Sequence, residues 1–336
     1  MPKLSVQIVT YNSLKFLEDC LESLLNQTFK DFQVLVIDNY STDGTLNFLK
    51  EKYPGIFIFR NSKNVGFAKA HNQGFTLING DYILVLNPDV ILEPNFLEKL
   101  LAAAEKKKAG FSFGGKLLKI KTGNQELGKK IKTKIIDSTG LKIYSWGQFR
   151  DRGEGEEDKG QYDKKKDVFG ISGACVLYRR KFLKEIGFFD EDFFAYKEDV
   201  DLSWRAQLFG FSSFYVPEAV AYHYRQAPKE RRLSQTPLIS FYSFRNGLFL
   251  ILKNAHWQNI ILYSPLIFAY LLIKKIYLLF TQPKICLRAK ISFILNFSKM
   301  YKKRERIFSA RGGSATGGKR IKITAKQFRK KFFSHS

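Results

Sequence analysis

The sequence predicts an α/β fold with a mainly parallel central sheet and helices on both faces. Strand and helix patterns alternate along residues 4–107. Strands that are joined by single helices form right-handed crossovers and pair in parallel. In addition, residues 82–86 (YILVL) are apolar without a break, as expected of a strand that is buried on both faces of such a sheet.

The elements can be justified in chain order. Residues 4–10 have the pattern of a buried strand, and Ser13 is a suitable N-cap for the helix that follows, whose apolar residues from Phe16 to Leu25 recur at the helical period. The next elements are expected to be a strand at 33–38, a helix ending at 53, a strand at 56–59, a helix at 66–78, a strand at 82–86 and a helix at 94–107.

The second part of this domain, which we expect to run from residue 1 to 235, is less regular. Residues 116–166 are rich in Lys, Gly and Glu and show little periodicity, so we expect a loop-rich insertion there. A helix ends at the stop signal Gly210, and short strands are expected at 214–216 and 219–224.

Residues 236–300 combine apolar and aromatic residues with single basic ones. The apolar run within 258–281 is broken by Lys274 and Lys275, whereas about 20 apolar residues are needed to span a bilayer. Helices that lie in the membrane interface are therefore expected here. The alternative is an ordinary pair of buried helices.

The net charge of +25 indicates a polyanionic partner: nucleic acid, anionic lipid or phosphorylated substrates. From Lys284 to the end there are sixteen Lys and Arg residues and one acid, Glu305. We expect residues 301–336, with the Gly/Ser stretch at 312–318, to be a flexible basic tail. An anionic membrane surface is its expected partner.

Composition also limits the class and location of the protein. A hydrophobic content of 45% excludes a disordered chain. The three cysteines are far apart and odd in number, which fits a reducing compartment. The first residues lack the pattern of a signal peptide, so the expected location is cytoplasmic, at the inner face of the cell membrane.

Polar residues follow the strand at 82–86. Asn87, Pro88 and Asp89 stand at its carboxyl end, where ligands bind in sheets of this type. The Asp89 carboxylate would suit Mg²⁺ or Mn²⁺. The alternative is a simple turn, since all three are turn residues.

Two other strands also end in polar residues. Asp38 ends the strand at 33–38, and Thr10, Tyr11 and Asn12 end the neighbouring strand. A carboxylate, an aromatic ring and an amide at one sheet edge could bind the base and ribose of a nucleotide, although each alone could be a cap or turn.

Five motifs in order resemble glycosyltransferase family 2, inverting sugar transferases of the GT-A fold. They are 9–12 (VTYN), 36–45 (VIDNYSTDGT), 64–68 with Asn72 (NVGFA…N), 87–89 (NPD) and 190–205 (DEDFFAYKEDVDLSWR). The resemblance spans residues 4–225 and is closest to the rhamnosyltransferase-like branch. The family commonly has acids at both ends of its metal motif, so Asn87 is a departure from the family pattern.

The resemblance implies a role for each matching residue. Nucleotide and donor binding would fall to Thr10, Tyr11, Asn12, Asp38, Asn39, Ser41, Asn64, Gly66 and Asn87. Asp89 would ligate a divalent metal, Mg²⁺ or Mn²⁺, with His223 as a candidate further ligand, although a lone His on a strand is more often structural. Asp199 would be the catalytic base, with Glu198 beside it. Asp201 is a competing base, and only one of Asp199 and Asp201 should face the pocket.

The leading hypothesis is thus an inverting transferase in cell-surface polysaccharide synthesis. It would move a sugar such as rhamnose from a dTDP or UDP donor to a glycan or polyprenyl-linked acceptor. The alternatives are a non-catalytic nucleotide-sugar-binding scaffold and a basic nucleic-acid-binding protein, the latter disfavoured because it leaves the acids at the strand ends unexplained.

Overall fold

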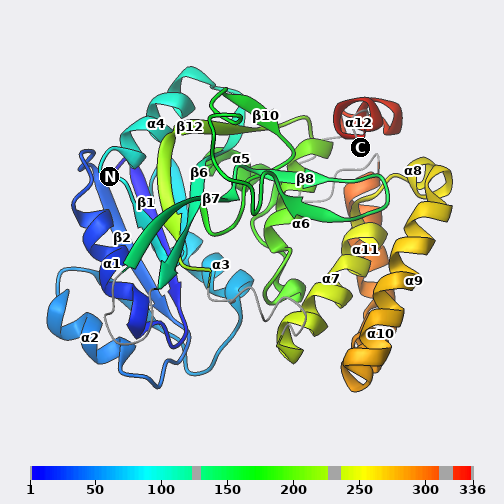
Figure 1. The fold of residues 1–336 in the computed structure, drawn as a ribbon, viewed down its shortest axis with the longest axis horizontal. Coiled ribbons are helices and arrows are strands. Elements are labelled where there is room, and N and C mark those ends of the chain that lie inside the picture. The colour runs from blue at the N-terminus through cyan, green and yellow to red at the C-terminus, as the bar shows by residue number, and fades with distance from the viewer. Residues whose placement is uncertain (1, 123–129, 226–235, 310–320, 334–336) are drawn as a thin grey trace. The chain divides into compact units, whose positions relative to one another are not determined.

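The structure is a computed structural model that describes residues 2–122, 130–225, 236–309 and 321–333 (Figure 1). The chain forms two compact units. The sheet unit comprises residues 1–141, 151–184 and 212–225, and the helical unit comprises residues 142–150, 185–211 and 226–336. The expected boundary at 235 stays a prediction, but segment 185–211 groups with the C-terminal helices.

Four parallel strands form one half of the sheet, in the order β4 (Tyr82–Leu86), β1 (Leu4–Thr10), β2 (Phe32–Asp38) and β3 (Phe57–Arg60). Helices α1 (Leu14–Leu25), α2 (Thr45–Lys52), α3 (Phe67–Leu77) and α4 (Phe96–Lys106) connect them or follow them. This confirms the expected alternation and the mainly parallel sheet.

The strands are apolar because both faces of the sheet are covered. Successive side chains of a strand point to opposite faces. Val36 packs in a cluster with residues of α1 and α4, whereas its neighbours Leu35 and Ile37 pack in a cluster with Ala70 of α3. All five residues of β4 are buried, as its unbroken apolar sequence predicts.

The other half of the sheet is mixed. Beyond β4 lie β11 (Cys175–Arg179), β6 (Gly110–Thr122), β12 (Ser212–His223) and β10 (Lys166–Val168), with β5 (Val90–Leu92) paired to β12 and β7 (Lys130–Ser138) paired to β6. The expectation of a loop-rich insertion at 116–166 is wrong for 116–122 and 130–138, where β6 and β7 are paired strands, whereas 144–148 and 152–165 are largely loops. The other partners of β6 are β11 and β12, which are far away in sequence, so local periodicity did not reveal this pairing.

The two short strands expected at 214–216 and 219–224 are one strand, β12. Its pairing with β6 shifts between Val216 and Val220, which is the irregularity that looked like a break. Gly115 of β6 lies at this point, where an added Cβ would come 2.1 Å from the Ala219 carbonyl oxygen. The bulge therefore requires a glycine on the neighbouring strand.

The helical unit begins with the 3-10 turn η1 (Glu191–Phe193) and helix α6 (Glu198–Leu208). It continues with α7 (Pro237–Asn254), α8 (Trp257–Leu262), α9 (Ser264–Thr281), α10 (Pro283–Leu295), α11 (Phe297–Phe308) and α12 (Ala325–Phe332). The chain passes from one unit to the other within three elements. They are β8 (Leu141–Ile143) and β9 (Phe149–Asp151), which form a hairpin, and helix α5 (Arg180–Ile186).

The expectation of a flexible tail at 301–336 is wrong for its described residues, because α11 and α12 are helices. The Gly/Ser stretch at 312–318 lies outside the described residues. Helix α12 begins with a capping box, in which Thr324 and Gln327 bond reciprocally, and Phe328 is almost fully buried. One aromatic anchor thus fixes a helix that is otherwise basic.

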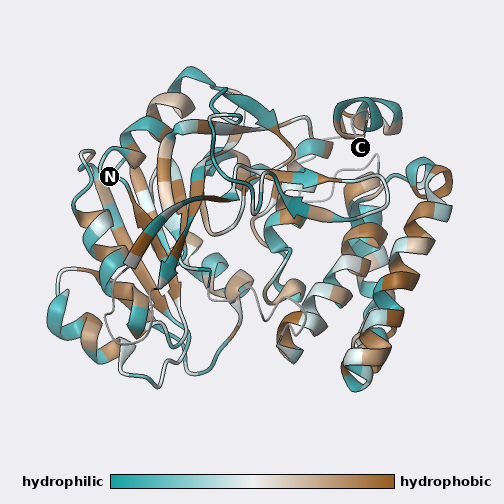
Figure 2. Ribbon diagram, viewed as in Figure 1, coloured by the Kyte–Doolittle hydropathy of each residue, from teal (hydrophilic) through white to brown (hydrophobic). Residues whose placement is uncertain are grey.

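Helix α9 is the one helix of the described chain that is long and apolar enough to cross a membrane by length and composition. Its mean hydropathy is 1.5, and only 6% of the window is buried. Hydrophobic residues run along it in Figure 2. Phe268 and Ile273 are each 68% exposed, and Phe280 is 86% exposed. An apolar surface of this kind fits either an interfacial or a spanning helix.

Candidate active site

The carboxyl ends of β1 and β2 meet in register, since Thr10 is opposite Asp38. The Asp38 side chain is fully buried. It accepts hydrogen bonds from the Thr10 hydroxyl at 3.1 Å and from the Ser41 amide at 3.2 Å, and the Arg60 Nε lies 3.6 Å from it. The expected grouping of Thr10, Asp38 and Ser41 is therefore present in the structure.

The loop after β1 is bound to the loop after β2. Asn12 has a left-handed backbone with φ of 54°, its amide donates to the Ser41 hydroxyl at 2.9 Å, and its side-chain oxygen accepts from the Thr42 amide at 2.8 Å. The rings of Tyr11 and Tyr40 remain 52% and 48% exposed at this edge. Two accessible rings close to a buried carboxylate could bind a nucleoside by stacking and hydrogen bonding.

Asparagines fix the next part of the edge. Asn39 donates to the Gly66 carbonyl at 3.2 Å and accepts from Asn61 at 2.9 Å. Asn64 accepts from the Gly66 amide at 2.9 Å, and Gly66 has a φ of 88° that favours glycine. The structure thus gives Asn39 and Asn64 a role in shaping the loop at the start of α3.

Asp89 and His223 face each other, as the pairing of β5 with β12 requires. Val90 is opposite His223, and the Tyr224 amide donates to the Asp89 carbonyl at 3.0 Å. The His223 Nε2 consequently lies 3.3 Å from a carboxylate oxygen of Asp89. Asn87 contributes through its backbone, whose amide donates to the Ala174 carbonyl at 2.8 Å.

Asp137 is a residue that the sequence did not single out. It lies on β7, in the segment expected to be loop-rich, and its carboxylate is 2.8 Å from the His223 Nδ1. Arg225 also binds Asp137, at 3.0 Å. Burial disfavours the charged imidazole, but the carboxylates of Asp89 and Asp137 outweigh this and raise the pKa of His223 to about 10.

This arrangement fits a divalent metal. A carboxylate and an imidazole nitrogen that face each other are suitable ligands, and a second carboxylate on the far ring nitrogen is the usual orienting partner of a metal-bound histidine. No group of three or more His, Cys, Asp and Glu side chains that could hold a metal occurs in the ranges that the structure describes. Donor oxygens and water would have to complete the coordination.

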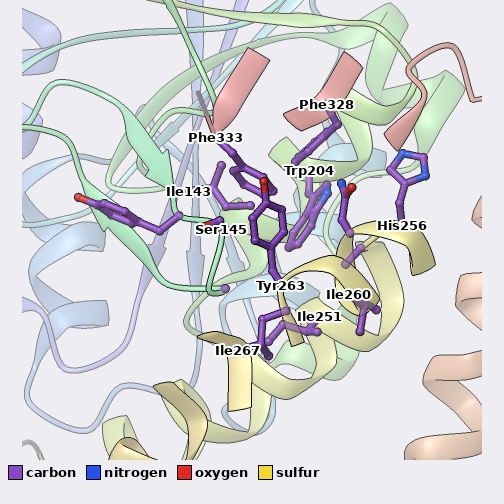
Figure 3. A pocket seen from close by; sticks show the side chains of 14 residues that line it. Ile143, Ser145, Trp204, Ile251, His256, Ile260, Tyr263, Ile267, Phe328 and Phe333 are labelled. Carbon is purple, nitrogen blue, oxygen red and sulfur yellow. The ribbon is translucent and has the colours of Figure 1, made fainter. Parts of the chain in front are cut away.

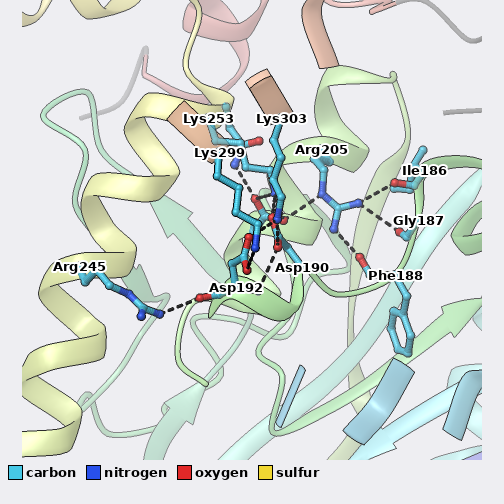
Figure 4. A network of polar contacts seen from close by, with 12 residues as sticks. Ile186, Gly187, Phe188, Asp190, Asp192, Arg205, Arg245, Lys253, Lys299 and Lys303 are labelled. Carbon is cyan, nitrogen blue, oxygen red and sulfur yellow. Dashed lines mark hydrogen bonds and ion pairs between the residues drawn. The ribbon is translucent and has the colours of Figure 1, made fainter. Parts of the chain in front are cut away.

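In the helical unit, the acidic segment expected to carry the catalytic base is fixed by ion pairs (Figure 4). Lys253 of α7 lies 2.6 Å from Asp190, and Lys303 of α11 lies 2.6 Å from Asp192. Burial raises the pKa of Asp190, but Lys253 and Lys303 outweigh this and hold the pKa well below its usual range. These acids are structural, since each is neutralised by ammonium groups.

The loop before α6 has a strained backbone. Phe194, Tyr196 and Lys197 have φ values of 63°, 67° and 73°, a region that non-glycine residues rarely adopt. The amide of Asn246 on α7 donates to the carbonyls of Phe193, Ala195 and Tyr196 at 3.0, 3.0 and 2.7 Å. Together with Arg245, which donates to the carbonyls of Asp192 and Phe193, Asn246 holds the loop that leads to Glu198 and Asp199.

The three acids that open α6 have different surroundings. Asp201 is fully buried and binds Arg205 at 2.9 Å, Lys253 at 2.8 Å and Asn254 at 2.8 Å. Asp199 is only partly buried and accepts from the Val200 amide at 2.7 Å. Burial and the charge of Asp199 raise the pKa of Glu198 to about 8.

Comparison with known proteins points to the same family that the sequence motifs resemble. The family model for glycosyl transferase family 2 matches residues 5–187, more than half of the chain, and the model for glycosyl transferase family group 2 matches residues 155–282. The N-acetylglucosaminyl-diphospho-decaprenol L-rhamnosyltransferase of Mycobacterium tuberculosis is 31% identical over 237 residues, which are 66% of this chain and 76% of that protein. The putative glycosyltransferase EpsH of Bacillus subtilis is 25% identical over 228 residues, 67% of this chain and 61% of that protein.

Solved structures show the same fold. A crystal structure of GalNAc-T7 with UDP, GalNAc and Mn²⁺ has a TM-score of 0.56 at 16% identity and covers 75% of this chain. A crystal structure of S. aureus TarS has a TM-score of 0.51 at 20% identity and covers 84% of it. This chain spans 48% and 44% of those two chains. The expected GT-A fold is confirmed, and the chain is a glycosyltransferase that belongs to glycosyltransferase family 2.

Proposed function

We propose that the enzyme transfers rhamnose or a related sugar, with inversion, from a dTDP or UDP donor to a polyprenyl-linked sugar acceptor. The observation that carries this proposal is the Asp89–His223 pair, which stands at a sheet edge that also presents Asp38. The 31% identity to a protein named for rhamnosyl transfer to a diphospho-decaprenol acceptor supports the choice of sugar and acceptor.

The sheet unit would bind the donor. Asp38 would accept from the base or ribose, Tyr11 and Tyr40 would stack, and the loop shaped by Asn64 and Gly66 would lie along the diphosphate. A Mg²⁺ or Mn²⁺ ion held by Asp89 and His223 would neutralise charge on the departing nucleoside diphosphate. The Mn²⁺ in the GalNAc-T7 structure supports this choice of ion.

The helical unit would supply the base. Inversion requires an acceptor hydroxyl to attack the anomeric carbon from the side opposite the leaving group, while a carboxylate removes the hydroxyl proton. We assign this role to Asp199, because Arg205, Lys253 and Asn254 already occupy the oxygens of Asp201. Glu198 would stay protonated near neutral pH, given its raised pKa.

The exposed apolar face of α9 supports peripheral attachment to an anionic membrane. The basic residues of α11 and α12 would add electrostatic attraction to such a surface. This placement would bring the enzyme to a lipid-linked acceptor.

Thermal shift with nucleotide sugars, with and without Mn²⁺, tests the proposal. A ligand at one hundred times its Kd stabilises the folded state by about 2.7 kcal/mol. We expect a dTDP- or UDP-sugar to stabilise the enzyme more strongly with Mn²⁺. Asp89→Ala should abolish the effect of the metal. Asp81→Ala is the matched control, because this exposed acid stands just before the other end of the same strand, β4.

Transfer itself is measured with the nucleotide sugar that stabilises the enzyme and an N-acetylglucosaminyl-diphospho-polyprenol acceptor. Formation of the longer glycolipid with inverted anomeric configuration is the expected result. If Mn²⁺ enhanced the stabilisation by the nucleotide sugar equally in Asp89→Ala and Asp81→Ala, Asp89 would not be a metal ligand. Donor binding without transfer to any lipid-linked sugar would contradict the proposed acceptor.

A further inference from the structure

A hollow in the helical unit is lined by two lysines and by no acidic residue. Lys197 before α6 and Lys274 of α9 line it together with residues of α7, and its volume is about 220 Å³ including space open to solvent. No Asp or Glu is among its lining residues. Within the described part of the chain, neither lysine forms an ion pair, in contrast to Lys253 and Lys303.

The contacts of the two ammonium groups are weak. Lys274 Nζ donates to the Ser243 carbonyl at 3.3 Å, and Lys197 Nζ lies 5.7 Å from the centre of the Phe149 ring. Burial lowers the pKa of Lys274 to about 8. Burial and the charge of Lys274 lower the pKa of Lys197 well below its ordinary value and outweigh the opposite effect of Asp199. A bound anion would relieve this unfavourable proximity of like charges.

The backbone commits Lys197 to this position. Its left-handed φ of 73° is held by the Asn246 hydrogen bonds to the preceding carbonyls. On α7, Gly247 leaves room for the ammonium group, since an added Cβ would lie 3.2 Å from Lys197 Nζ. Lys197 is also two residues before Asp199, so a group bound here would be close in the chain to the assigned base.

A second hollow adjoins the first, with Gly147 and Ile251 in both linings. Its volume is about 380 Å³ including open space, and its walls are mainly apolar and aromatic. Trp204, Tyr263, Phe328 and Phe333 gather around it in Figure 3. Among its lining residues, too, there is no Asp or Glu.

We propose that the two hollows form one site for the polyprenyl diphosphate of the acceptor. Lys197 and Lys274 hold the diphosphate, and the apolar hollow takes the first isoprene units of the chain. The inference rests on the proposed function and adds where the acceptor binds. Charge complementarity favours this occupant, because the site pairs an apolar groove with two lysines whose protonated form a bound anion would stabilise, as an amphiphile with a dianionic head requires.

Farnesyl diphosphate is a soluble probe for this site. Binding to the full chain, without metal or donor, can be followed by calorimetry and by tryptophan fluorescence, since Trp204 lies in the apolar wall. We expect Lys274→Met to weaken binding at least tenfold, and Lys197→Met with Lys274→Met to abolish it. Lys275→Met is the matched control, because it removes the same charge from the next position of α9, and it should bind as the wild type does.

Gly247→Ala tests the site without removing a charge. Alanine favours a helix by up to about 1 kcal/mol over glycine, so this variant should fold at least as well, yet its methyl group would lie 3.2 Å from Lys197 Nζ and would push the ammonium group aside by a few tenths of an ångström. We expect binding of farnesyl diphosphate to weaken several-fold. Equal losses in Lys274→Met and Lys275→Met, or unchanged binding in both Gly247→Ala and Lys274→Met, would overturn the inference.

Two further probes separate the sources of the anion. Inorganic pyrophosphate should bind more weakly than farnesyl diphosphate and in a lysine-dependent way, and farnesol should bind weakly in every variant. Pyrophosphate that binds as tightly as farnesyl diphosphate would indicate a free-anion site and overturn the lipid assignment. Nucleotide-sugar binding should be measured on the same samples. Absence of nucleotide-sugar binding would contradict the proposed function, whereas the farnesyl diphosphate measurements test only the acceptor site.

Discussion

Acidic residues of the sheet unit and of the helical unit are partnered in different ways. Asp38 accepts from a hydroxyl and an amide, and its one cation, Arg60 at 3.6 Å, is exposed, while Asp89 faces one imidazole at 3.3 Å. In the helical unit, Asp190 and Asp201 are bound by lysines and an arginine. A carboxylate that is saturated by buried cations holds structure. One whose partners are neutral or exchangeable can still bind a ligand.

Asp199→Asn should give the largest effect. An amide cannot take a proton from the acceptor hydroxyl, so turnover should fall by about 10²–10⁴-fold, the usual contribution of a general base. Donor affinity and thermal stability should be close to those of the wild type. Steady-state transfer and donor titration measure the two quantities.

Glu191→Gln is the control for loss of an acid in the same segment, because Glu191 is exposed. It should retain turnover. Near-normal transfer by Asp199→Asn would show that the base lies elsewhere and would break the distinction between the two kinds of acid.

Asp201→Asn should instead destabilise the fold. It would leave Arg205 and Lys253 buried without this carboxylate, and loss of one partner from a buried ion pair costs about 3–5 kcal/mol. Denaturant unfolding followed by circular dichroism measures the change. If the variant were as stable as the wild type but inactive, Asp201 would be the base and Asp199 would not.

The sequence predicted the part of the site that depends on local patterns. Thr10, Asp38 and Asp89 each end or follow an apolar strand, so their meeting at one sheet edge follows from the parallel arrangement alone. Asp137 could not be found in this way. Its place beside His223 depends on how β6, β7 and β12 pair, and the register of these distant strands is not written in local periodicity.

In the helical unit, the prediction from composition failed although a local signal was present. Its basic composition suggested a flexible tail, whereas the capping box at Thr324 and the buried Phe328 specify a helix. The capping signal was present in the sequence. The partner of Phe328, the Trp204 ring at 5.9 Å, was not deducible, since it comes from a segment more than one hundred positions earlier.

The pH dependence of folding stability tests the comparison at Glu198, and its expected effect is the smallest of these predictions. Glu198 is a buried acid, and burial together with the charge of Asp199 raises its pKa from 4.5 to about 8. The folded state therefore keeps a proton that the unfolded state releases above pH 4.5. Stability from this group is fully present below pH 4.5 and falls as pH rises through 8.

Glu198→Gln removes this titration, because glutamine stays neutral. Measured between pH 5 and 9 without metal or donor, the midpoint of thermal unfolding of the wild type should decline relative to that of Glu198→Gln, and the difference should level off above pH 8. Glu305→Gln, at an exposed acid of α11, should follow the wild type. Parallel curves for the wild type and Glu198→Gln would mean that Glu198 is ionised in the folded enzyme. Glu198 would then belong with Asp199 as a second candidate base, because a charged carboxylate with no saturating cation is the kind of acid that this comparison associates with ligand binding and catalysis.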